Sequence, residues 1–215
     1  MDFKKVLIKK EKDFDLLRDI DLYDTKDIYI TLDDNIKFKE PIKPIDLSNQ
    51  NVYIIGNFNI LSNICIINKE PYDDKKYAGY TGLFSKAKNI TVNNLVINES
   101  FVCGGEICGT LAGEVEEEIA LNGVRFEGLD VYSEAYGGGV AGICDTMTII
   151  DSGISSKVSG IDVVGGVVGL TKSYSSTNTI VSTETIKTGS DLAKCFGREV
   201  GYCDKKNIKC YSRDN

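Results

Sequence analysis

Carboxylates are the side chains of this sequence best able to do chemistry, and they gather in the middle of the chain. Residues 90–165 contain twelve acidic residues against two basic ones, Arg125 and Lys157, and the 215-residue chain has a net charge of −7. A concentration of negative charge attracts cationic partners and repels nucleic acid. The candidate partner-binding residues are Glu114, Glu116, Glu117, Glu118, Glu127, Asp130 and Glu134.

The densest acidic run, from Glu114 to Glu118, has two other interpretations. It fits a solvated edge that keeps a sheet protein soluble and prevents edge-to-edge association. It also fits a divalent-cation site, but the chain has no EF-hand loop and no GGxGxD repeat, and unconstrained glutamates bind Ca²⁺ weakly. We therefore expect neither a metal site nor a cofactor.

Paired carboxylates are also what glycoside hydrolysis requires. If each repeat formed one coil of stacked strands, equivalent residues of neighbouring repeats would be about 5 Å apart. Two pairs of carboxylates could be related in this way: Glu106 with Glu134, and Glu134 with Asp162. The chain has no histidine, which removes the usual imidazole acid or base and the His-containing zinc site. We expect a protein that is not an enzyme, with a polysaccharide-active enzyme as the least favoured alternative.

The seven cysteines predict free thiols. Their number is odd and no two form a CxxC pair, which is typical of small buried side chains in a reducing compartment. The spacing of Cys103 and Cys108 leaves a disulfide or a metal site as less favoured alternatives.

A glycine-rich motif repeats through the chain and must position these side chains. Its closing residues are 28, 29, 27 and 32 positions apart, and a steady period predicts a solenoid with one coil per repeat. The glycines lack a phosphate-loop pattern, so we expect them to serve tight turns or close packing of coils. The motif occurs at 81–85, 109–113, 138–142, 165–169 and 197–201.

Two columns of small or apolar residues keep the same phase as the motif, which predicts inward-facing stacks. Glu199 breaks the second column in the last repeat, where a terminal coil meets water. The first column is Ala87, Val115, Cys144, Thr171 and Cys203, and the second begins with Leu83, Leu111, Val140 and Val167.

Asn or Gly recurs at another position, which indicates a turn that needs left-handed backbone angles. We align Asn63, Asn94 and Gly123 at this position, with Asn178 and Asn207 near the same phase. A chance recurrence in an Asn-rich chain is the alternative.

The two ends of the chain look different from the repeats. Residues 1–24 are expected to form an N-terminal cap, with a short helix in residues 13–22 that starts at Asp13 or Asp15, and residues 25–215 the solenoid. A polar loop is expected at 71–76. No signal peptide or membrane-spanning run is visible, so we expect a cytosolic protein that does not bind membranes. Apolar coil ends would allow a homodimer.

The motifs at 138–142 and 165–169, with Thr-Gly-Leu-Phe at 81–84, resemble the GLUG-type glycine-rich repeats of parallel β-helix proteins. The resemblance covers roughly residues 45–205. It implies an all-β fold, a single-stranded right-handed parallel β-helix of about five or six coils, whose handedness also follows from the rule for parallel crossovers. Members are mostly large secreted or surface-attached bacterial proteins, adhesins among them.

These observations predict a non-catalytic protein-binding β-helix. Its most concrete form is an intracellular inhibitor or immunity-type protein that covers a basic partner, such as a nuclease toxin, with an acidic face. The alternative is a structural or adhesive repeat domain of a bacterial surface protein.

Overall fold

The structure is a computed structural model that describes residues 2–20, 24–68, 79–188 and 195–203. The loop expected at 71–76 and the turn expected at Asn207 lie outside these residues. In the described part, no helix is long and apolar enough to span a membrane.

Three parallel sheets build the molecule, named here A, B and C. Sheet A contains β1 (Phe3–Ile8), β2 (Asp27–Leu32), β4 (Ile45–Ile55), β8 (Phe84–Asn93), β11 (Ala112–Asn122), β14 (Ala141–Ile150), β17 (Val168–Thr177) and β20 (Val200–Cys203). Sheet B contains β3 (Ile36–Lys37), β5 (Ile60–Ser62), β9 (Val96–Cys103), β12 (Arg125–Ser133), β15 (Gly153–Gly160) and β18 (Ile180–Lys187), with β6 (Cys65–Ile67) also paired to β9. Sheet C contains β7 (Tyr80–Thr81), β10 (Ile107–Cys108), β13 (Tyr136–Gly138), β16 (Val163–Gly165) and β19 (Cys195–Gly197).

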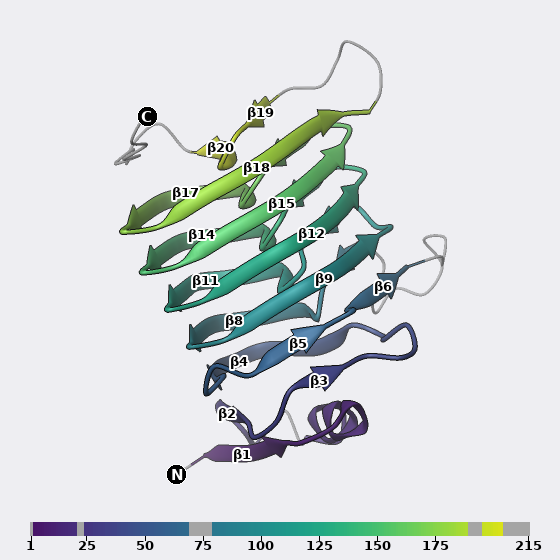
Figure 1. The fold of residues 1–215 in the computed structure, drawn as a ribbon, viewed down its shortest axis with the longest axis vertical. Coiled ribbons are helices and arrows are strands. Elements are labelled where there is room, and N and C mark those ends of the chain that lie inside the picture. Colours follow the sequence, from purple (N-terminus) through teal and green to yellow (C-terminus); the bar gives the residue numbers. More distant parts are fainter. Residues whose placement is uncertain (1, 21–23, 69–78, 189–194, 204–215) are drawn as a thin grey trace.

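The chain visits sheets A, B and C in turn and so forms a parallel β-helix of about six turns. Figure 1 shows sheet B strands running from left to right in front and sheet A strands returning behind, while successive coils rise toward the C-terminus. That path is right-handed, so the predicted fold class is confirmed.

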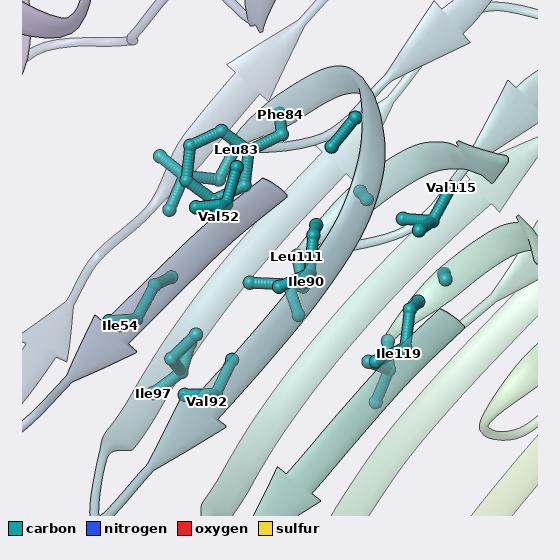
Figure 2. Packing of buried hydrophobic residues seen from close by; sticks show 14 of the residues in the cluster. Val52, Ile54, Leu83, Phe84, Ile90, Val92, Ile97, Leu111, Val115 and Ile119 are labelled. Atoms are coloured by element: carbon teal, nitrogen blue, oxygen red, sulfur yellow. The ribbon is translucent and has the colours of Figure 1, made fainter. Parts of the chain in front are cut away.

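The core lies between the sheets, where alternate residues of each strand point inward (Figure 2). Both predicted columns exist: β11 pairs Val115 with Ala87 on one side and with Cys144 on the other. In the second column, Leu111 N donates to Val140 O at 2.9 Å, and Val140 N to Val167 O at 2.8 Å. These stacks bury a continuous set of apolar side chains, and such burial is the main source of stability in this kind of fold.

The glycine motif forms the turn from sheet C to sheet A, and close packing of coils explains its glycines. A Cβ at Gly138 would lie 1.9 Å from Ala141 O and 2.7 Å from Val168 Cα, both backbone atoms. Side chains of sheet B secure the same turn: Ser156 Oγ donates to Gly166 O, and Thr183 Oγ1 donates to Arg198 O.

β-Bulges explain why the first three motif intervals, of 28, 29 and 27 residues, differ from one another. β11 carries one residue more than β8 and β14 between Val115 and Ile119. β12 carries one residue more than β15 between Phe126 and Leu129, and β9 shares this second bulge because it pairs with β12 residue by residue. A coil with no bulge therefore has the 27-residue interval, one bulge gives 28, and two give 29. Bulges add residues on the outer side of a strand without shifting its inward pattern.

The turn from sheet A to sheet B has the left-handed angles that the Asn and Gly pattern predicts. φ is 52° at Asn94, 64° at Gly123 and 51° at Asn178. Asn63 also has a left-handed φ, of 58°, as predicted. Its alignment with this turn is wrong, since Asn63 lies between β5 and β6 and its N donates to Asn98 O at 3.1 Å. The equivalent turn of that coil contains Asn57 and Phe58.

The N-terminal segment is part of the stack. β1 pairs in parallel with β2, so the boundary expected at residue 24 falls inside the first coil. The helix is a 3₁₀ helix, η1 (Glu11–Leu17), with Lys10 as N-cap in place of the expected Asp13 or Asp15. Asp13 instead accepts hydrogen bonds from Lys9 N and Lys10 N at 2.8 and 3.1 Å. Phe14 packs on Phe38 with ring centroids 5.3 Å apart and covers this end of the core.

The last described coil ends the core with polar groups. Tyr174 hydroxyl donates to Glu199 Oε2 at 2.9 Å, and the half-buried Thr185 of β18 stands where β15 has the buried Val158. The last described coil is therefore partly polar inside, and a homodimer through coil ends stays a prediction.

Candidate partner-binding surfaces

All seven candidate carboxylates fall in one coil, residues 113–142, which we call the acidic coil. They do not form one face: Glu114 to Glu118 lie on β11 in sheet A, Glu127 and Asp130 lie on β12 in sheet B, and Glu134 follows in the next turn. The predicted single acidic face is therefore a belt around the solenoid, with Arg125 as its one base.

On sheet A, lysines of the preceding coil neutralise part of the belt. Lys86 Nζ lies 2.9 Å from Glu114 Oε2, and Lys88 Nζ lies 3.4 Å from Glu117 Oε1. Burial lowers the pKa of Lys86, but the hydrogen bond to Glu114, together with Tyr80, outweighs that effect and raises the pKa above its usual value. Glu116 makes no ion pair with any described residue and lies in the bulge of β11.

A ladder of side-chain hydrogen bonds also leads to Glu117. Asn51 Nδ2 donates to Asp27 Oδ1 at 2.8 Å, and Asn89 Nδ2 donates to Asn51 Oδ1 at 2.9 Å and to Glu117 Oε2 at 2.7 Å. The Asn89 hydrogen bond and the nearby Lys88 hold the pKa of Glu117 below its usual value. Asn89 Oδ1 also accepts a hydrogen bond from the backbone N–H that follows Glu117, at 2.9 Å. The ladder shows that Glu117 has a structural role in ordering sheet A.

On sheet B, the charges alternate across neighbouring strands. The register places Asp130 beside Lys157, and Lys157 beside Glu184. Opposite charges on adjacent strands stabilise a sheet modestly. Asp130 is thus partly compensated, whereas Glu127 lies at the start of the β12 bulge near the turn from sheet A.

The carboxylate pairs considered for catalysis lie on neighbouring coils. Glu134 N donates to Gly105 O at 3.1 Å and Ala135 N to Glu106 O at 2.9 Å, so Glu134 follows Glu106 by one coil. Val163 N donates to Ala135 O at 2.8 Å, which puts Asp162 one coil further. The two residues of each predicted pair are therefore one coil apart, at the turn between sheets B and C.

A shallow groove of about 720 Å³ lies on the surface of the described residues, and the sequence did not predict it. It crosses the turns from sheet A to sheet B, which are stacked at the left edge of Figure 1. Val96, Arg125, Gly153 and Ile180 form one outward row across β9, β12, β15 and β18. An isolated glycine inside a strand, away from the repeated motif, is the sequence signal that points to such a hollow.

The cysteines in the described residues are free, as predicted. Burial raises the pKa of Cys108 and of Cys144 to about 12, so both are neutral thiols at physiological pH. Burial and the nearby Asp130 also raise the pKa of Cys103. Within these residues, no three His, Cys, Asp or Glu side chains are grouped to hold a metal ion.

Comparisons with known proteins add little to this description. No family model matches the chain, and no curated protein matches it. One solved structure that matches is that of "a putative immunoglobulin A1 protease from Bacteroides ovatus", with a TM-score of 0.42 and 13% identity. The match covers 92% of this chain and 83% of that one. At this level of similarity we draw no functional conclusion from it, and the GLUG resemblance stays a prediction.

Proposed function

We propose that this chain is a non-catalytic protein-binding β-helix. In its most concrete form it is an intracellular inhibitor of the immunity type, which neutralises a basic protein such as a toxin. The proposal rests on one observation: seven carboxylates and one base share a single coil of an otherwise mixed-charge solenoid.

The part of the acidic coil most suited to a flat partner surface is on sheet A. Glu116 and Glu118 are exposed and form no ion pair with a described residue, whereas Glu114 and Glu117 are engaged by lysines of the preceding coil. A partner that presents lysine or arginine here gains attraction without first breaking an existing pair. Such charge complementarity acts mainly on the association rate and on specificity.

The test compares two charge-reversal variants of equal net charge. Glu116→Lys/Glu118→Lys changes the acidic coil, and Asp19→Lys/Glu40→Lys makes the same change at exposed positions near the N-terminal end. The basic protein captured by the tagged wild-type chain at low salt is identified, purified and titrated by calorimetry. We expect the first variant to lose about tenfold or more in affinity and the control to stay within about twofold.

Salt provides the second measurement, because screening weakens exposed charge pairs. The wild-type affinity is expected to fall with added salt, and that of the Glu116→Lys/Glu118→Lys variant to fall less. If the acidic-coil variant and the Asp19→Lys/Glu40→Lys control lose affinity equally, then overall charge matters and not the acidic coil. That result would contradict the proposal.

A further inference from the structure

The groove beside the acidic coil has features of a site for an extended peptide. Its two ends carry Phe58 and Ile180, whose exposed fractions of 74% and 79% are the highest among the exposed large apolar residues of the described chain. Ligand sites are concave and are lined mainly by apolar side chains with a few polar groups, and this groove has both.

Phe58 is also held in an unusual backbone conformation. Its φ is 62°, in the left-handed region that a bulky residue rarely adopts. Phe58 N donates to Asn94 O at 2.7 Å, so the turn is fixed against the next coil while the ring points to solvent. Backbone strain of this kind concentrates at functional sites.

The floor of the groove is open at Gly153. A Cβ built at this residue would meet no atom within 4 Å, in contrast to the glycines of the repeated motif. Its neighbours in the row, Arg125 and Ile180, carry long side chains, so Gly153 leaves a notch between two walls. The notch accepts a side chain from outside.

The polar lining carries a net negative charge. The charged residues of the lining are Glu127, Asp151 and Arg125, and Asp151 Oδ1 accepts a hydrogen bond from Asn178 Nδ2 at 2.6 Å. A cationic side chain in the middle of a ligand would have its charge near these carboxylates and its aliphatic stem over Val96. Lysine and arginine commonly bind in this divided manner.

The spacing of the ends sets the length of the ligand. Phe58 and Ile180 are four coils apart, about 19 Å at ~4.8 Å per coil. An extended chain covers that distance in about six residues at ~3.3 Å each. We infer that this groove binds an extended peptide segment with apolar side chains about six residues apart and a lysine or arginine between them. The inference rests on the proposed function only in that the peptide segment belongs to a protein partner.

The test uses a phage-displayed library of linear peptides, panned on the immobilised chain and counter-selected on the Gly153→Trp variant. The introduced indole would fill the notch from the solvent side, so the variant is expected to fold and to unfold at a temperature no lower than the wild type. Ser159→Trp is the matched control, because Ser159 lies on the outer side of the same strand beyond the groove.

We expect enriched peptides with the stated pattern, whose dissociation constants, measured by fluorescence anisotropy, rise at least about tenfold in Gly153→Trp and stay unchanged in Ser159→Trp. Glu127→Gln/Asp151→Asn should weaken the same peptides and flatten their salt dependence. The inference is overturned if no peptide is enriched, if the enriched peptides lack the pattern, or if they bind Gly153→Trp as well as the wild type. It is also overturned if light scattering finds a dimer that Gly153→Trp abolishes, because a second copy would then occupy the groove.

The two proposals fail separately. Glu116 and Glu118 lie on sheet A, away from the groove lining, so Glu116→Lys/Glu118→Lys should leave peptide binding unchanged. If Gly153→Trp loses peptide binding but keeps its affinity for the basic partner protein, then that partner binds sheet A and not the groove.

Discussion

At the scale of single residues, Cys144 shows how the fold uses a reactive side chain as an inert one. It is buried between Val115 and Thr171 in an inward column, and its Sγ donates to Thr171 Oγ1 at 3.9 Å. The folded environment disfavours the thiolate, since burial raises the pKa to about 12 from 9.0. The thiol here is a core group of suitable size.

This pKa shift predicts a stability difference that depends on pH. The folded state binds the Cys144 proton more tightly than the unfolded state. The stability that the neutral thiol contributes is therefore complete below pH 9 and is lost as pH rises from 9 towards 12. In the neighbouring coil, the position of Cys144 is occupied by Val115. The Cys144→Val variant has no thiol to ionise here, so it should not lose this stability at high pH. The free energy of unfolding is measured in urea between pH 8 and 11. We expect the difference between the variant and the wild type to shift in favour of the variant by up to about 1.4 kcal/mol per pH unit above about 9. A difference that does not change with pH would contradict this.

At the scale of elements, the turn from sheet C to sheet A decides which glycines are essential. Gly138 faces backbone atoms of the next turn, and backbone cannot move aside as a flexible side chain can. Gly153, on β15, faces open space. The two glycines look alike in the sequence except for the motif around Gly138.

We therefore predict opposite effects for two alanine substitutions. Gly138→Ala should lower the free energy of unfolding by more than about 2 kcal/mol, because a close backbone contact must be relieved. Gly153→Ala should leave it unchanged or raise it by up to about 1 kcal/mol, because glycine weakens a strand. Denaturant titration of both variants checks this, and similar effects at both positions would show that close packing does not explain the motif.

The elements also show what the sequence reveals and what it hides. The motif and the inward columns were predictable, because each is a residue type that one repeated environment requires. The alignment of Asn63 failed because Asn57 and Phe58 form the preceding turn in its place. Single-residue bulges have no signature strong enough to place them. The sequence predicts a single acidic face where the structure has a belt, because bulges and turns decide the sheet on which each glutamate lies.

At the scale of the whole molecule, the two ends of the solenoid are finished by different means. Phe14 and Leu17 of η1 cover the apolar N-terminal end, whereas the last described coil becomes partly polar inside at Thr185 and Glu199. Within the described residues, its outer strand β18 pairs with one neighbour, β15. Stability in a solenoid depends on neighbouring coils, so it should fall towards this end.

Hydrogen exchange followed by mass spectrometry checks the gradient. We expect the amides of β18 to exchange faster than those of β12, which has neighbours on both sides in the same sheet. The amides of β8 and β11, which pair on both sides within sheet A and lie far from the open end, should be the slowest. Equal protection of β18 and β12 would show that residues outside the described ranges secure the C-terminal end.

The uniform parallel pairing has an evolutionary consequence. Each coil boundary from β8 to β18 uses the same kind of backbone ladder and inward columns of similar size. Duplication or loss of one gene segment encoding a coil would thus join surfaces that already fit, and would change the rod by about 4.8 Å. The length of the molecule, and with it the distance between the sites on its surface, can evolve in whole coils without redesign of the core.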